Sequence, residues 1–314
     1  MRRALLSWTL VIAFLAAGFG ASVLALNGDV FSAHGFVRSY LETLARKDTA
    51  GALAFAGVDV PANESRLLLQ DAALGDIDDI QFLSDDVTNA VHTVRFSYRF
   101  TTGRETSEFT VKHAGTRLAL FDTWQFADSP LASLAVTVLH DSRFDANGVQ
   151  ANGDDTYTVF RPGLYDLGHT SKYLSARTVA VAVTDPGTQK GEVDVEANDS
   201  FDAAATKAVG SFLDDCATQQ VLMPTGCPFG YEEPNRIDGL PQWSMVDYPT
   251  VKVAASDTIG SWTATGQGAV ANIKVVVRSL FDGSTSKLDK NVDFEASYRV
   301  VVGADNSLTV SAEP

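Results

Sequence analysis

The chain opens with one long apolar segment, and shorter patterns of helical and alternating apolar positions follow it. Residues 5–26 carry no charge, and as a helix they would measure roughly 33 Å at about 1.5 Å per residue. The hydrocarbon core of a bilayer is roughly 30 Å thick. Arg2 and Arg3 precede the segment and Asp29 follows it, which places the amino terminus in the cytoplasm by the positive-inside bias. The pattern predicts a single-pass membrane anchor over residues 1–27.

A cleaved signal peptide is the alternative interpretation of the same segment. Small residues between Ser22 and Ala25 would suit a cleavage site near Ala25, and arginines before an apolar run are typical of such peptides. The apolar part of a signal peptide is usually about 7–15 residues long, however, and this run is longer. One interpretation predicts a cell-membrane protein with its C-terminal domains outside, and the other a secreted protein. Both export the rest of the chain.

The next part of the chain changes from a helical period to an alternating one. Apolar residues recur at helical spacing over Ser32–Arg46, and shorter helices are expected over 49–56 and 65–74. Over 94–124 apolar and polar residues alternate with a period of two, which indicates half-buried strands joined by short turns. Helices followed by an antiparallel sheet predict an α+β domain over residues 28–130.

The remaining patterns predict a small all-β module and a second α+β domain. Residues 131–190 contain alternating segments and turn residues without a convincing helix. Residues 191–314 begin with an amphipathic helix from about Ser200. The strands expected after that helix cover residues 244–253, 271–279, 292–302 and 307–312.

Charge and composition narrow the possible partners. The formal net charge of the 314 residues is −15, and the two arginines before the apolar segment leave −17 for the rest of the chain. Nucleic acid is not expected as a partner, because phosphate binding needs clustered lysines and arginines. Hydrophobic residues make up 45% of the chain, which is enough for folded cores and argues against long disorder.

The chain contains two cysteines, Cys216 and Cys227. Outside the cytoplasm a pair of cysteines usually forms a disulfide. Closing a loop of about 12 residues would stabilise the fold by roughly 3 kcal/mol in the chain-entropy model. The alternatives have little support, since a zinc site needs four ligands and a redox pair usually has C-x-x-C spacing.

Three sequence blocks resemble domains of Gram-positive envelope proteins. The stretch FVRSYLETLARKDTAGALAFAG, continuing to FDTWQF, resembles the NTF2-like or cystatin-like domains that lie just outside single-pass anchors. The middle block, FDANG followed by VFRPGLYDL, resembles small β modules in proteins of the teicoplanin-resistance-associated type. The last block, with CPFG and SLFDG, is similar to a second NTF2-like domain.

The resemblance implies an overall architecture and one candidate pocket. The architecture is α+β: an N-terminal transmembrane helix, then NTF2-like or cystatin-like helix-plus-antiparallel-sheet domains, separated by a small all-β module. NTF2-like folds enclose a cavity between the sheet and the helices, and Tyr98, Phe100, Phe109 and Trp124 would line it here. The alternative is that these aromatic residues only fill the core.

Motifs for chemistry are sparse. Residues 284–287 match S-x-x-K but follow an Asp-Gly turn between expected strands, which favours a hairpin loop over a catalytic helix. Residues 145–148 and 152–155 have calcium-ligand types but lack EF-hand spacing, so two turns are the better interpretation. The histidines lack metal-ligand spacing. They are His34, His92, His113, His140 and His169. We therefore expect no catalytic, cofactor or metal site.

These observations predict a non-enzymatic, extracytoplasmic, membrane-anchored protein of the bacterial cell envelope that binds or scaffolds a partner. The membrane would be contacted through residues 5–26, and an envelope protein, a peptide or a wall polymer would be the partner. The alternative function is a small-ligand carrier or enzyme that uses an NTF2-like pocket.

Overall fold

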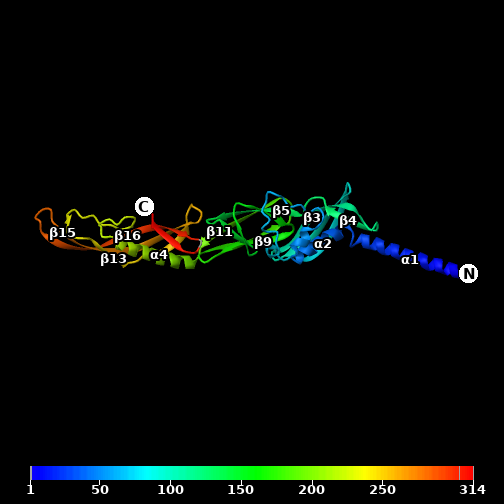
Figure 1. The fold of residues 1–314 in the computed structure, drawn as a ribbon, viewed down its shortest axis with the longest axis horizontal. Coiled ribbons are helices and arrows are strands. Elements are labelled where there is room, and N and C mark those ends of the chain that lie inside the picture. Colours follow the sequence, from blue (N-terminus) through cyan, green and yellow to red (C-terminus); the bar gives the residue numbers. More distant parts are fainter. Residues whose placement is uncertain (1, 304, 314) are drawn as a thin grey trace. The chain divides into compact units, whose positions relative to one another are not determined.

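The computed structural model describes residues 2–303 and 305–313, with side chains from residue 13 onward. The chain is mostly β, with 49% of it in strands and 19% in helices (Figure 1). It divides into two compact units. The first comprises Met1–Thr137, Arg143–Leu167 and Thr178–Glu192, and the second comprises Val138–Ser142, Gly168–Arg177 and Val193–Pro314.

The helices are α1 (Arg2–Gly28), α2 (Ala33–Ala45), α3 (Thr49–Leu53), the short 3₁₀ helix η1 (Asp71–Ala73) and α4 (Asp199–Ala217). The first sheet contains β1 (Asp78–Thr88), β2 (Val91–Phe100), β3 (Gly103–Arg117) and β4 (Phe121–Phe126). The second contains β5 (Leu131–Leu139), β6 (Arg143–Ala146), β7 (Val149–Asn152), β8 (Thr156–Phe160), β9 (Gly163–Thr170), β10 (Leu174–Val183) and β11 (Thr188–Ala197). The third contains β12 (Arg236–Ile237), β13 (Gln242–Asp247), β14 (Thr250–Ala255), β15 (Ser261–Arg278), β16 (Thr285–Val302) and β17 (Leu308–Ala312).

Helix α1 contains the apolar segment of residues 5–26, of which 5–12 lie outside the described side chains. Over the side chains that are described, no single helix is both long and apolar enough to cross a membrane. Ala13–Gly28 and Ala33–Ala45 together meet that requirement by length and composition, with a bend of 59° between them.

The start of helix α2 follows from its capping residue. Ser32 is the N-cap, and its hydroxyl accepts a hydrogen bond from the Gly35 backbone N–H at 3.0 Å, which satisfies one of the free amides of the first turn. The helix predicted over Ser32–Arg46 is confirmed. The helix expected over 65–74 is wrong, because only the single turn Asp71–Ala73 forms there.

The first sheet has the order β1-β2-β3-β4 and is antiparallel throughout. Strand β2 pairs with β3 over its whole length, from Val91 opposite Lys112 to Phe100 opposite Gly103. Its alternating apolar residues Val94, Phe96, Tyr98 and Phe100 are buried, as alternation predicts for a strand with one face on a core. The strands predicted in this region are confirmed.

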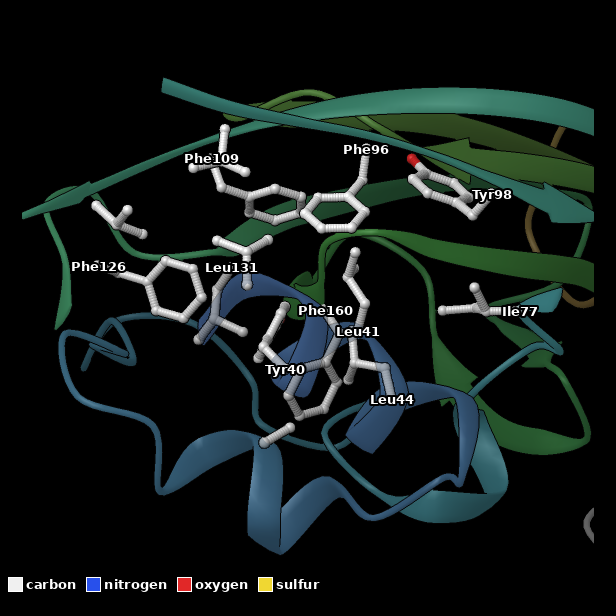
Figure 2. Close-up of a cluster of buried hydrophobic side chains, with 14 of the residues drawn as sticks. Tyr40, Leu41, Leu44, Ile77, Phe96, Tyr98, Phe109, Phe126, Leu131 and Phe160 are labelled. Carbon is white, nitrogen blue, oxygen red and sulfur yellow. The ribbon is translucent and has the colours of Figure 1, made fainter. Parts of the chain in front are cut away.

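One hydrophobic core lies between this sheet and helix α2. Figure 2 shows Tyr40 and Leu41 of the helix pointing toward Phe96 and Phe109 of the sheet, with Phe126 beside them. Each of these five side chains is at most 2% exposed. Tyr40 makes edge-to-face contacts with Phe126 and Phe109, at 5.1 and 6.2 Å between ring centroids, the geometry that aromatic rings prefer.

The second sheet has the order β7-β6-β9-β10-β11-β5-β8. No helix interrupts residues 131–197, all of which are described. The absence of a helix over 131–184, which the sequence predicts, is therefore confirmed. Asn147 shapes the turn between β6 and β7: its carboxamide N–H₂ donates to the carbonyls of Ala73 and Leu164, and its oxygen accepts from the Asp166 N–H.

The second unit contains helix α4 and the third sheet. Asn198 caps α4 by accepting from the backbone N–H groups of Ser200 and Phe201. The helix buries Phe201, Val209 and Leu213 among others and contacts β13, β14 and β17. At its end, Cys216 forms a disulfide with Cys227, with the Cα atoms 5.8 Å apart. The predicted disulfide is confirmed.

The predicted α+β fold class is wrong, because the chain is mostly β. The N-terminal transmembrane helix that formed part of this prediction is not found as a single span among the described side chains. Among the described residues after 78, α4 is the only helix. Helices α2 and α4 form where the helical spacing predicts them, but only a single turn forms within residues 65–74. The strands extend well beyond their clearest alternating segments. Strands β15 and β16, for example, are 18 residues long each.

Candidate functional site

The candidate site is the outer end of the long β15–β16 hairpin. The two strands pair antiparallel from Ser261 opposite Val301 to Arg278 opposite Thr285. A pairing this long projects the turn between them away from helix α4, which contacts β13, β14 and β17 and the opposite end of the hairpin at Trp262 and Tyr298. We call residues 235–242 together with 274–290 the hairpin end.

One edge of the hairpin end carries no further strand. Strand β17 pairs with β16 only from Tyr298 to Val302, so residues 285–296 have no strand on their outer side within the part of the chain that is described. Open edges invite pairing with other chains, and exposed lysines reduce this tendency. Lys287 and Lys290 lie exposed on this edge. The edge is therefore protected, and the turn is the more available contact.

The turn itself is held in one shape by hydrogen bonds. The Ser279 N–H donates to the Ser284 carbonyl at 2.9 Å, and the Gly283 N–H donates to the Ser279 carbonyl at 3.1 Å. Asp282 accepts from the N–H and the hydroxyl of Ser284 at 3.1 and 2.8 Å, and these bonds lower the pKa of the Asp282 carboxyl group. Gly283 has a φ of 74°, a conformation that glycine adopts without strain.

Two neighbouring apolar side chains project from this ordered turn. Phe281 is 100% exposed and Leu280 is 73% exposed. Leu240, on the segment between β12 and β13, is 66% exposed and lines an open pocket of about 250 Å³ with Val276 and Leu288. Single exposed apolar residues are common on protein surfaces. A fully exposed phenylalanine beside an exposed leucine, on a turn that hydrogen bonds preorganise, is a stronger signal of contact with a partner.

The hairpin end is locally basic in an acidic protein. It contains five basic residues and three acidic ones, whereas the whole chain has a formal net charge of −15. Two of its basic residues are paired: Arg278 with Asp238 at 2.7 Å and Lys274 with Asp289 at 3.7 Å. A surface with this charge favours a partner that carries acidic groups around an apolar contact.

The aromatic residues expected to line a pocket lie in the core of the first unit. Tyr98 and Phe109 are fully buried, Phe100 is 3% exposed, and Trp124 is half-buried against the same cluster. The Tyr98 hydroxyl forms a 2.6 Å hydrogen bond with Ser107, and burial raises the pKa of Tyr98 to about 12. The pockets described on the defined surface are lined by other residues.

Most of the histidines pair with aspartates. The pairs are His34 with Asp29 at 3.6 Å, His92 with Asp85 at 2.8 Å, His113 with Asp122 at 3.2 Å and His140 with Asp194 at 3.1 Å. The fifth histidine, His169, is 3% exposed and has no hydrogen-bond partner for either ring nitrogen. Within the residues described, no group of three or more histidine, cysteine or acidic residues could hold a metal ion.

One histidine pair includes a serine, so that the three residue types of a catalytic triad meet. The Ser32 hydroxyl lies 3.0 Å from Nδ1 of His34, whose Nε2 faces Asp29. That hydroxyl, however, donates its hydrogen to the Asp29 carbonyl at 2.5 Å and accepts from the Gly35 N–H. A hydroxyl committed to capping a helix is not free to act as a nucleophile. This cluster is a structural cap.

The other motifs form turns. The S-x-x-K residues 284–287 begin at the hairpin turn and continue into β16, so the predicted hairpin loop is confirmed. Residues 147–148 and 153–154 form two turns beside short strands, which confirms that interpretation as well. The sequence analysis used Leu280 and Phe281 only as part of the SLFDG stretch of the resemblance and did not predict a contact surface from them, although two apolar residues directly before an Asp-Gly turn are a usable signal.

Comparison with known proteins adds no assignment. No family model matches the chain, and neither a curated protein nor a solved structure matches it.

Proposed function

We propose that this protein is a non-enzymatic binding or scaffolding protein of the bacterial cell envelope, and that the hairpin end contacts its partner. The observation that carries this proposal is the complete exposure of Phe281, next to Leu280, on a turn fixed by hydrogen bonds. Burying one such phenylalanine against a partner would contribute about 1.5–3 kcal/mol. Because the turn is already ordered, binding would not lose conformational entropy by ordering it.

The location of the protein belongs to the same proposal. We propose that the chain is attached to the membrane through residues 5–26, with the two units outside the cytoplasm, and the alternative is secretion after cleavage near Ala25. The Cys216–Cys227 disulfide supports export, because disulfides persist in oxidising compartments. An intact amino terminus in carbonate-washed membranes is the expected result, and a mature chain starting near Leu26 in the medium would contradict attachment.

Site-specific photocrosslinking in whole cells tests the binding surface. A benzophenone amino acid replaces Leu240, which is exposed beside the hairpin turn, and the same amino acid at Ile259 serves as the control. Ile259 is 61% exposed in the same unit, so the two positions differ in location more than in exposure. We expect a discrete adduct from position 240 and none from position 259.

A second substitution shows whether the adduct depends on the exposed phenylalanine. In the Phe281→Ser background, the adduct from position 240 should be lost, while the disulfide-bonded fold and the expression level stay unchanged. Equal adducts from positions 240 and 259, or an adduct that survives Phe281→Ser, would show that the hairpin end is not the contact surface.

A further inference from the structure

A second exposed turn, in the first unit, has a conformation that its residues do not favour. It joins β3 to β4 and closes with the Leu120 N–H donating to the Arg117 carbonyl at 3.1 Å. Leu118 and Ala119 have φ values of 55° and 53°. Two successive positive φ values are typical of a type I′ turn, for which Asn-Gly is the favoured pair. A left-handed conformation is unfavourable for a residue other than glycine, because its Cβ atom crowds the following carbonyl oxygen.

Both residues with positive φ, Leu118 and Ala119, are exposed, and so is Leu120 beside them. The Leu118 side chain is 78% exposed, and that of Leu120 is 39% exposed. Arg117, at the end of β3, is exposed as well. An exposed leucine at a position that favours asparagine stabilises neither the turn nor the core. Strain that persists at such a position points to a function for the side chain outside the folded unit.

Hydrogen bonds attach this turn to the carboxyl end of helix α1. The Asn27 carboxamide N–H₂ donates to the Leu120 carbonyl at 2.8 Å, and its oxygen accepts from the Asp122 N–H at 3.3 Å. Asn27 is the first strongly polar residue after the apolar segment. The turn therefore lies level with the point at which the apolar part of the helix ends.

Two contacts of aromatic side chains next to the turn also attach strand β4 to the segment that follows α1. The rings of Phe31 and Phe121 lie 4.5 Å apart, and the Trp124 indole N–H donates to the Phe31 carbonyl at 2.8 Å. These contacts brace the chain that leaves α1 against strand β4. The turn cannot move far from the end of the helix without breaking them.

We propose that the turn of residues 117–120 is a second membrane contact, in which Leu118 and Leu120 enter the lipid surface beside the end of α1. The inference rests on the proposed membrane attachment through residues 5–26. Where a helix leaves the bilayer, a turn bonded to its last residues lies in the interfacial region, in which apolar side chains are stabilised by lipid. Arg117 would extend its charged group to the lipid phosphates, as basic residues do at that depth.

The contact would fix how the first unit stands on the membrane. A helix by itself lets the attached domain rotate and tilt, whereas a second point of insertion removes part of that freedom. One leucine inserted in lipid adds a modest stabilisation, comparable to burying a leucine side chain. This is the same order as the strain that the turn carries, so membrane contact would offset it.

Depth measurements on the full chain in liposomes of mixed zwitterionic and anionic lipid test the proposal. The two native cysteines form a disulfide, so a single introduced cysteine can be labelled with a polarity-sensitive fluorophore. The labels are placed at Phe19 in α1, at Leu118, and at Thr102 in the turn at the opposite end of β3. Strand β3 has 15 residues, so Thr102 lies about 50 Å from Leu118 at roughly 3.3 Å per residue.

The three positions separate failure of this inference from failure of the membrane attachment. We expect a blue shift and quenching by spin-labelled lipid at positions 19 and 118, and an aqueous spectrum at position 102. Lipid contact at 19 with an aqueous spectrum at 118 would overturn the inference and leave the attachment intact. An aqueous spectrum at position 19 would remove the attachment, and the inference would fall with it.

A paired substitution distinguishes a membrane role from a structural one. Leu118→Asn with Ala119→Gly installs the residues that the turn favours, so the full chain in detergent should unfold at a higher urea concentration. With the label moved to Leu120, the same variant in liposomes should lose lipid quenching. A variant that is more stable but keeps its quenching, or one that is less stable, would contradict the assignment.

Discussion

Replacing Gly35 by alanine tests the close approach that sets the junction between α1 and α2. A Cβ atom at this position would lie 2.3 Å from the Asp29 carbonyl oxygen and 2.6 Å from that of Val30, distances that real Cβ contacts essentially never show. Both obstacles are backbone, so no side chain can rotate away. The chain between the helices would have to shift, and the Asp29 carbonyl that accepts from Ser32 would shift with it.

The size of the effect follows from three opposing contributions. Overpacking against backbone costs about 1–3 kcal/mol, and weakening the Ser32 cap costs about 1 kcal/mol more. Alanine returns up to about 1 kcal/mol through its higher helix propensity. The net expectation for Gly35→Ala is a loss of about 1–3 kcal/mol in local stability, which corresponds to a 5- to 150-fold loss of amide protection at 1.36 kcal/mol per factor of ten.

Gly210→Ala in helix α4 is the matched control. The nearest atoms to a Cβ there are the ring carbons of Tyr248, the closest at 3.6 Å, which is ordinary contact. The same substitution should therefore stabilise α4 by about 0.5–1 kcal/mol. Hydrogen exchange by mass spectrometry on the full chain in nanodiscs measures both helices locally. If Gly35→Ala raises the protection of α2 as Gly210→Ala raises that of α4, the steric reasoning is refuted.

Three further predictions concern buried tyrosines and the disulfide. Burial holds the pKa of Tyr40 and Tyr165 far above the usual range and that of Tyr98 at about 12. Unfolded tyrosines ionise near pH 10, so above that pH the folded unit binds more protons than the unfolded chain. Above pH 10 the free energy of unfolding of the first unit should therefore fall by up to about 4 kcal/mol per pH unit, summed over the three tyrosines. A urea midpoint that stays constant from pH 9 to 11.5 would contradict this. Tyr40→Phe removes a hydroxyl whose single hydrogen is shared between the backbone carbonyls of Arg161 and Pro130, at 3.1 and 3.3 Å. This substitution should lower the urea-derived stability of the first unit by about 1–2 kcal/mol, and an unchanged midpoint would count against this hydrogen bond. The double substitution Cys216→Ser and Cys227→Ser should lower the stability of the second unit by about 3 kcal/mol, as measured by thermal unfolding. The parent protein under reducing conditions should lose the same stability as the double variant.

Local signals predicted several elements of this fold correctly. The N-cap at Ser32 with helically spaced apolar residues predicted α2, and strict alternation around Phe96 predicted β2. The cysteine pair predicted the disulfide. Each of these features depends on residues close together in the chain or on the chemistry of the residues themselves, so a sequence pattern was enough to predict it.

Features that depend on residues far apart in the sequence could not be predicted from such local patterns. The helix expected over 65–74 does not form, and the Asp71 carboxylate there accepts from the N–H and hydroxyl of Thr49 instead. Strands β15 and β16 are longer than predicted, because the half of β16 near the turn is mostly polar, and its two apolar residues, Leu288 and Val292, do not set up an alternating pattern. Its strand form comes from pairing with β15, which only the folded sheet provides.

The sequence by itself therefore determined the apolar N-terminal segment, the acidic charge, the disulfide and the helices and strands with strong local patterns. Only the tertiary structure decided which apolar residues are exposed. Phe109 lies within strand β3 and Phe281 in the turn after β15; both are phenylalanines, yet one is fully buried and the other fully exposed. The difference arises because burial depends on which surfaces pack over a residue, and those surfaces come from distant parts of the chain.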